Sequence, residues 1–166
     1  MKKILALLAV IAAIALPSRA ESYTNEQIIA MCDTILNTPY DAKSPSMSHI
    51  NQLKTNVMEW AVDNHDIKLT IGQWNEELFK DLNQDQGSAM LYAYIMADLR
   101  YMLMHGLKET TLESVQAAMR ETLEYYKRAN GKIRETKSLK RMCRLSEQQF
   151  NDFVARQYEA VMSQQE

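Results

Sequence analysis

Four side chains that could carry out acid–base chemistry share one face of a predicted helix. Tyr94, Asp98, Tyr101 and His105 are separated by four, three and four residues, which places them along one stripe of an α-helix. A carboxylate and an imidazole on such a stripe can act as general acid and base, with the tyrosines orienting a ligand, if the stripe borders a pocket. The alternative interpretation is structural: Asp98 and His105 have local hydrogen-bond partners, and the tyrosine rings pack with their hydroxyls outward.

A second candidate site is the basic stretch 127–144, where eight basic residues against the single acid Glu135 give a formal charge of +7. The basic residues are Lys127, Arg128, Lys132, Arg134, Lys137, Lys140, Arg141 and Arg144. An exposed patch of this charge could bind an anionic glycan, an anionic lipid headgroup or an acidic protein. The alternative is that acidic neighbours neutralise the stretch and that its first two residues compensate a helix dipole.

The sequence predicts no metal site and no cofactor. Met102 and Met104 lie about 200° apart around a helix, so they cannot face one copper ion together with His105. A run of oxygen ligands that begins at Asp81 lacks the glycine and the glutamate that a calcium loop needs. The chain has no nucleophile motif, no phosphate-binding glycine loop and no Cys-x-x-Cys pair. Enzyme activity therefore has no support beyond the Asp98 and His105 hypothesis.

Helices must position both candidate sites, because apolar residues recur at steps of three and four, which is the helical period. Gly and Pro are scarce, at four and three residues, which disfavours sheet folds with many tight turns. The sequence therefore predicts an all-α, single-domain bundle of about six or seven helices. We expect helices over about 45–64, 74–82, 110–129, two further ones at 24–37 and from 146 onward, and a central one at 88–106.

The helix at 88–106 is apolar on nearly every side, which is typical of a helix covered by its neighbours. An extended connector is expected at 66–72, where apolar and polar residues alternate. Three helix starts carry possible capping boxes, in which a hydroxyl and a Gln or Glu lie three residues apart: Thr24 with Gln27, Thr110 with Glu113, and Ser146 with Gln149.

Residues 1–20 are predicted to be a cleaved signal peptide. Two lysines precede an apolar run over 4–16, which is too short to span a bilayer. Ser18 and Ala20 then have the spacing of a signal-peptidase site. Cleavage after Ala20 would leave residues 21–166 as one helical domain, exported to a periplasm or secreted, soluble and not membrane-spanning.

Cys32 and Cys143 are the only two cysteines, and both follow the predicted cleavage site. In an oxidising compartment two cysteines are usually paired. The sequence therefore predicts a disulfide between the first helix and the stretch before the last helix.

The leading functional hypothesis is a non-enzymatic binding module outside the cytoplasm, such as an inhibitor, an immunity protein or an accessory factor. Its partner would be an unknown protein, an anionic glycan or a lipid, since export makes nucleic acid a less natural target. One alternative is a small-ligand or lipid carrier with a pocket beside the helix at 88–106. A second alternative is a hydrolase that uses Asp98 and His105.

Overall fold

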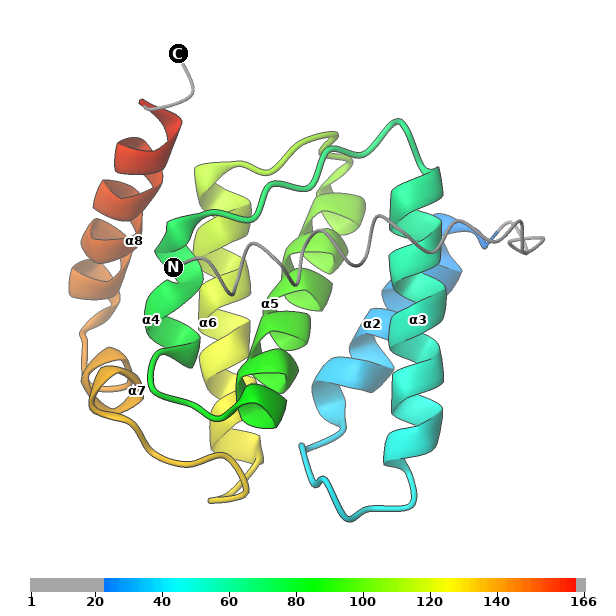
Figure 1. Ribbon diagram of the computed structural model, residues 1–166. Coiled ribbons are helices and arrows are strands. Elements are labelled where there is room, and N and C mark those ends of the chain that lie inside the picture. The colour runs from blue at the N-terminus through cyan, green and yellow to red at the C-terminus, as the bar shows by residue number, and fades with distance from the viewer. Residues whose placement is uncertain (1–22, 164–166) are drawn as a thin grey trace.

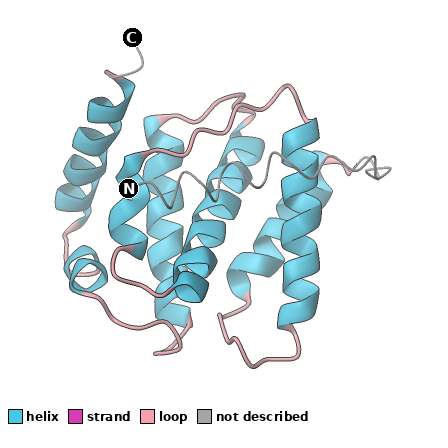
Figure 2. Ribbon diagram, viewed as in Figure 1, coloured by secondary structure: helices cyan, strands magenta, loops and turns pink. Residues whose placement is uncertain are grey.

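The computed structural model describes residues 23–163, so the predicted signal peptide and its cleavage site lie outside the described residues. Within this range the chain forms seven α-helices, one short 3₁₀ helix and no strand (Figure 2). The predicted all-α bundle is thereby confirmed. The elements are α2 (Asn25–Asn37), α3 (Met47–Asp63), η1 (Gln73–Asn75), α4 (Glu76–Phe79), α5 (Gln84–His105), α6 (Leu112–Arg128), α7 (Lys137–Met142) and α8 (Glu147–Met162).

Helix α5 lies at the centre of the bundle (Figure 1). It packs against α2 on one side, α6 on another and α4 on a third, and ten of its residues are buried. The predicted central helix is therefore confirmed, but it begins at Gln84 rather than near residue 88. The Asn83 side chain accepts a hydrogen bond from the backbone N–H of Gln86, and this cap adds a polar first turn to the apolar helix.

The other helices lie on either side of the α5 and α6 pair (Figure 1). Helices α2 and α3 pack together on one side, and α4, α7 and α8 lie on the other. Among residues 23–163, no helix combines the length and the apolar character that crossing a membrane requires.

The helix starts show where the capping predictions succeed. The capping boxes of Thr24 with Gln27 and of Ser146 with Gln149 are both formed. The third prediction is wrong by one residue, because Thr111 caps α6 and pairs with Ser114. Thr110, the residue expected to cap this helix, instead turns its hydroxyl into the core.

Helix α7 has no counterpart among the helices expected from the sequence. The Thr136 side chain accepts a hydrogen bond from the backbone N–H of Leu139 and starts the helix. Leu139 and Met142, one turn apart, are both buried. These two buried side chains pack this six-residue helix against the bundle, while the opposite side of the helix is exposed.

The connector between α3 and η1 is extended, as predicted. The backbone N–H of Lys68 donates to the carbonyl of Lys108 at 2.7 Å, and the Lys68 carbonyl accepts from Thr110 N at 3.2 Å. This bridge fastens the connector to the loop that joins α5 to α6. Both segments therefore help to enclose the part of α5 that carries Asp98.

Candidate anion-binding site

The structure separates the four residues of the predicted acid–base stripe into a buried pair and a surface pair. Tyr94 and Asp98 are both fully buried. The Tyr94 hydroxyl accepts a hydrogen bond from Trp74 Nε1 at 2.7 Å, and Asp98 Oδ2 accepts one from Thr110 Oγ1 at 3.1 Å. This pair belongs to the hydrogen-bonded interior of the bundle.

Tyr101 and His105 lie at the C-terminal end of α5, where His105 is exposed and Tyr101 is partly exposed. Their rings stack with centroids 4.0 Å apart, and His105 Nδ1 is 2.8 Å from the Tyr101 carbonyl oxygen. Asp98 and His105 therefore have different hydrogen-bond partners and do not form an acid–base pair. Met102, on the same helix, is fully buried like Tyr94.

The predicted disulfide is not formed, because both cysteines are free. Cys32 is buried on α2, where its Sγ lies 3.9 Å from Met96 Sδ on α5, and burial raises its pKa to about 12. Cys143 lies at the end of α7, partly exposed. Because α2 and α7 lie on opposite sides of the α5 and α6 pair (Figure 1), the two thiols face different neighbours.

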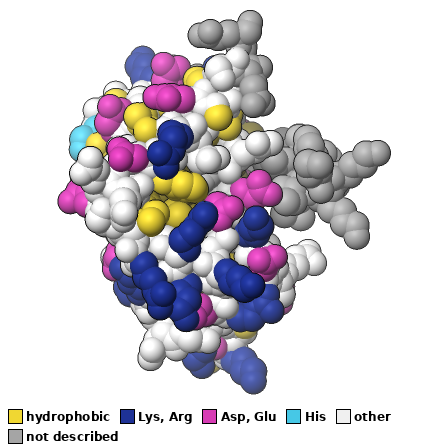
Figure 3. Space-filling view, turned by 90° about the vertical axis from the view of Figure 1, so that its left-hand side faces the viewer, with side chains coloured by type: hydrophobic (Ala, Val, Ile, Leu, Met, Phe, Trp, Pro, Cys, Tyr) yellow, Lys and Arg dark blue, Asp and Glu magenta, His cyan; other side chains and the backbone are white. Residues whose placement is uncertain are grey.

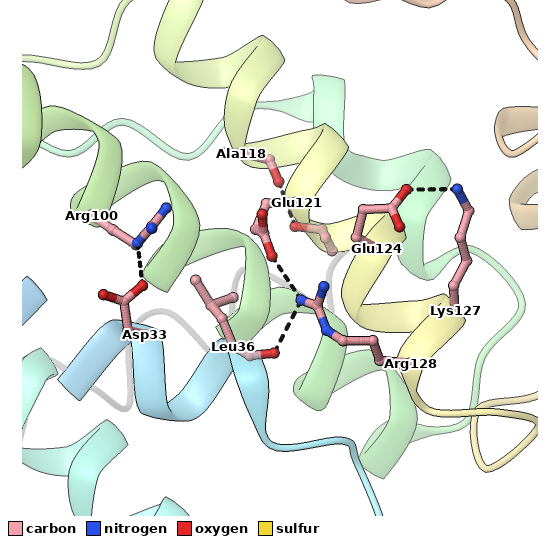
Figure 4. Close-up of polar contacts among 9 residues, drawn as sticks. Asp33, Leu36, Arg100, Ala118, Glu121, Glu124, Lys127 and Arg128 are labelled. Atoms are coloured by element: carbon pink, nitrogen blue, oxygen red, sulfur yellow. Dashed lines mark hydrogen bonds and ion pairs between the residues drawn. The ribbon is translucent and has the colours of Figure 1, made fainter. Parts of the chain in front are cut away.

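Arg128, one of the eight predicted anion-binding residues, joins two helices. It lies at the end of α6 and donates to the Leu36 carbonyl at 3.1 Å and to Glu121 at 2.7 Å (Figure 4). The Leu36 carbonyl belongs to the last turn of α2, where helix carbonyls lack an intrahelical donor. Arg128 on α6 therefore supplies a hydrogen-bond donor to the C-terminal end of α2. It lies next to the ion pair that Asp33 of α2 forms with Arg100 of α5.

Replacing Arg128 with alanine should lower the free energy of unfolding by about 1 to 3 kcal/mol, because a charge-assisted hydrogen bond is lost and the Leu36 carbonyl loses its donor. Among the described residues, the neighbouring Lys127 pairs with Glu124 on its own helix at 2.6 Å, and both side chains are about half exposed. The matched change of Lys127 to alanine should therefore cost less than about 0.5 kcal/mol. Urea unfolding followed by circular dichroism measures both, and equal losses would contradict the role of Arg128.

Three of the six remaining basic side chains have partners at the surface. Lys132 pairs with Asp41 at 3.3 Å and Lys140 with Glu135 at 2.9 Å, while Arg134 donates to the carbonyl of Asp81. Exposed pairs of this kind contribute about 0 to 1 kcal/mol each. The carboxylates of Asp41 and Glu135 lower the charge of the patch, but both pairs can exchange for an incoming anion.

Helix α7 and the turn after it form a hollow in this basic surface, with a volume of about 340 Å³. We call it the α7 hollow, and its lining residues are Lys137, Lys140, Arg141, Arg144 and Leu145. Figure 3 shows the side of the molecule where α7 and α8 lie in Figure 1, and Lys and Arg side chains gather there at the height of α7. The hollow thus concentrates positive charge in a concave part of the surface.

Arg141 is fixed in place at the hollow by two neighbouring helices. Its guanidinium is 2.9 Å from Glu77 on α4 and lies over the Phe153 ring on α8, 5.6 Å from the ring centroid. Glu77 also accepts a hydrogen bond from Ser138 Oγ at 2.6 Å. These contacts hold α7 against α4 and α8 and give the hollow a defined shape.

Lys137 and Arg144 have no acidic partner within 4.0 Å among residues 23–163. They lie at the two ends of the hollow, one at the start of α7 and one just after its end. Both side chains are exposed. An incoming anion can therefore contact two cations here without first displacing a carboxylate.

Sequence reasoning identified the four cations of the hollow but missed Leu145 and the helix that aligns them. The signal was present: Thr136 can cap a helix, and residues 137, 140, 141, 144 and 145 recur at helical steps. Because this segment contains many charged residues, its two apolar residues at helical spacing, Leu139 and Met142, were not interpreted as the buried side of a helix.

Comparison with known proteins adds no relative, because no family model, no curated protein and no solved structure matches the chain. In the part of the chain that the structure describes, no three His, Cys, Asp or Glu side chains gather as a metal site would require.

Proposed function

We propose that this chain is an exported, non-enzymatic binding module that holds an anionic partner in the α7 hollow. The observation that supports the proposal is the set of four cationic side chains around one concave surface, two of them without an acidic partner in the described residues. Like charges held close together repel one another, and a bound anion relieves that repulsion. The separation of Asp98 from His105 favours binding over catalysis.

The excess of positive charge supports the same proposal. Of the eight basic residues in 127–144, Arg128 is used to join α6 to α2, and several others form exposed pairs. Lys137 and Arg144 remain, and the paired Lys140 and Arg141 lie between them along α7. A ligand with several negative charges can contact all four, which a single carboxylate cannot.

Charge reversal of Lys137 and Arg144 to glutamate should strongly weaken retention on immobilised heparin at low salt. Each exposed charge pair contributes about 0.2 to 1 kcal/mol, and a reversal both removes an attraction and adds a repulsion. Together the two reversals should weaken binding by about 2 kcal/mol, or about 30-fold. Elution along a salt gradient measures the effect, because exposed charge contacts are screened by salt.

The matched control reverses Lys43 and Lys108, which are also exposed and are not among the residues that line the hollow. It changes the net charge by the same amount and should remain retained like the original protein. If the original protein passes through the column, or if both double variants elute equally early, the proposal is wrong.

A further inference from the structure

The residues that line the α7 hollow form one continuous helical stripe that changes from charged to apolar. Positions 137, 140, 141, 144 and 145 follow the steps of one helix face. The turn after α7 continues this face, since Arg144 N donates to the Arg141 carbonyl at 3.0 Å and Leu145 N to that of Met142 at 3.3 Å. Leu145 lies at the end of this stripe, in the turn after α7.

The wall of the hollow is amphipathic. Leu145 contributes carbon atoms, and the long stems of the lysines and arginines add more, since such side chains lie along apolar surface with their charges in water. Phe153 lies beneath the Arg141 guanidinium, and Figure 3 shows apolar side chains next to the Lys and Arg side chains on this face. A partner that carries only charge would leave the Leu145 end of the stripe unused.

The shape of the hollow also restricts its partner. Its volume of about 340 Å³ is at the lower end of the range of about 300 to 1,000 Å³ for ligand pockets, so it can hold one or two side chains. The hollow is open to solvent, so its size and its amphipathic wall together select the partner. Arginine forks bind carboxylates through two parallel hydrogen bonds, and an apolar side chain beside carboxylates matches Leu145 beside the four cations.

On the basis of the proposed function, we propose that the α7 hollow binds an acidic polypeptide segment in which an apolar side chain lies among carboxylates. The carboxylates contact Lys137, Lys140 and Arg144, and the apolar side chain contacts Leu145. Arg141 stays between Glu77 and Phe153 and presents the outer edge of its guanidinium. The partner is thus a protein with an acidic, partly apolar segment.

The test compares two fluorescein-labelled acidic peptides that differ only at a central residue, which is leucine in one and serine in the other. Fluorescence anisotropy with the full chain should show that the leucine peptide binds about 5- to 10-fold more tightly, since part of a leucine side chain leaves water. Leu145→Ala should remove most of this difference. The Lys137→Glu, Arg144→Glu double variant should weaken the binding of both peptides.

Each outcome separates this inference from the proposed function. Equal binding of the two peptides by the original protein overturns the inference without any variant, so a folding defect of Leu145→Ala cannot obscure it. Heparin or anionic phosphatidylglycerol vesicles that bind through Lys137 and Arg144, without binding of either peptide, overturn the inference and leave the proposed function standing. Absence of charge-dependent binding to every anionic probe overturns both.

Discussion

Replacing Trp74 with alanine should lower the free energy of unfolding by about 3 to 5 kcal/mol, the usual cost of removing a large buried aromatic side chain. Trp74 is fully buried on η1. Its indole N–H donates to the Tyr94 hydroxyl on α5, and its ring lies 5.3 Å from that of Tyr158 on α8. The loss is large against a typical net stability of about 5 to 15 kcal/mol.

Urea unfolding of a short variant series separates packing from hydrogen bonding at Trp74. Trp74→Phe should cost about 1 to 3 kcal/mol, because the buried Tyr94 hydroxyl loses its donor, and adding Tyr94→Phe should recover part of that loss. The control is Trp60→Ala, since Trp60 is only partly buried and donates to the Tyr23 carbonyl. If Trp74→Ala costs no more than this control, Trp74 does not join the three elements as the structure indicates.

The helices could be predicted because local sequence determines them. The capping boxes at Thr24 and Ser146 and the apolar steps along α5 require only residues within one or two turns. Helix α7 was missed because its six residues are half charged and its anchors, Leu139 and Met142, bury their side chains against helices distant in sequence. Short helices depend on such tertiary contacts more than on their own propensity.

The candidate sites were only partly predictable, because residues that share a helix face need not share an environment. The stripe passes from the fully buried Tyr94 and Asp98 to the partly exposed Tyr101 and the exposed His105. Likewise, the sequence shows the positive charge of 127–144 but not which acidic residues pair with it. Arg141 forms an ion pair with Glu77, and Lys132 forms one with Asp41, and both acids are distant in the sequence. The predicted disulfide is wrong for the same reason. An oxidising compartment and a count of two cysteines do not show whether the two residues lie close enough in space to form a bond.

Ionisation of Asp98 should make the protein less stable as the pH rises from about 4 to about 6. Burial raises the pKa of this carboxyl from 3.8 to about 6, while the nearby hydroxyls of Ser114 and Thr110, of which Thr110 donates to Oδ2, act in the opposite direction. Asp98 is fully buried, and within residues 23–163 its Oδ1 has no hydrogen-bond partner. Desolvation dominates here because two hydroxyl contacts do not replace the hydration of a carboxylate.

The sign of the effect follows from the two states of the chain. In the unfolded chain the carboxyl has a pKa of about 3.9, so between about pH 4 and 6 the folded state binds more protons than the unfolded state. The stabilising contribution of protonated Asp98 is therefore complete below about pH 4 and is lost as the pH rises through about 6. The difference between a pKa of about 3.9 in the unfolded chain and one of about 6 in the folded chain corresponds to about 3 kcal/mol.

Asp98→Asn tests this linkage because asparagine has nearly the same shape and cannot ionise. Relative to the original protein, the variant should gain about 3 kcal/mol in the free energy of unfolding between pH 4 and pH 7, measured by urea unfolding at several pH values. Thr110→Val, which removes the hydroxyl that donates to Asp98 at 3.1 Å, should move the transition to higher pH, since an ionised carboxylate then loses a donor. Parallel pH profiles for the original protein and Asp98→Asn would show that Asp98 keeps one protonation state, and the buried, half-satisfied carboxyl would then need another source of stabilisation.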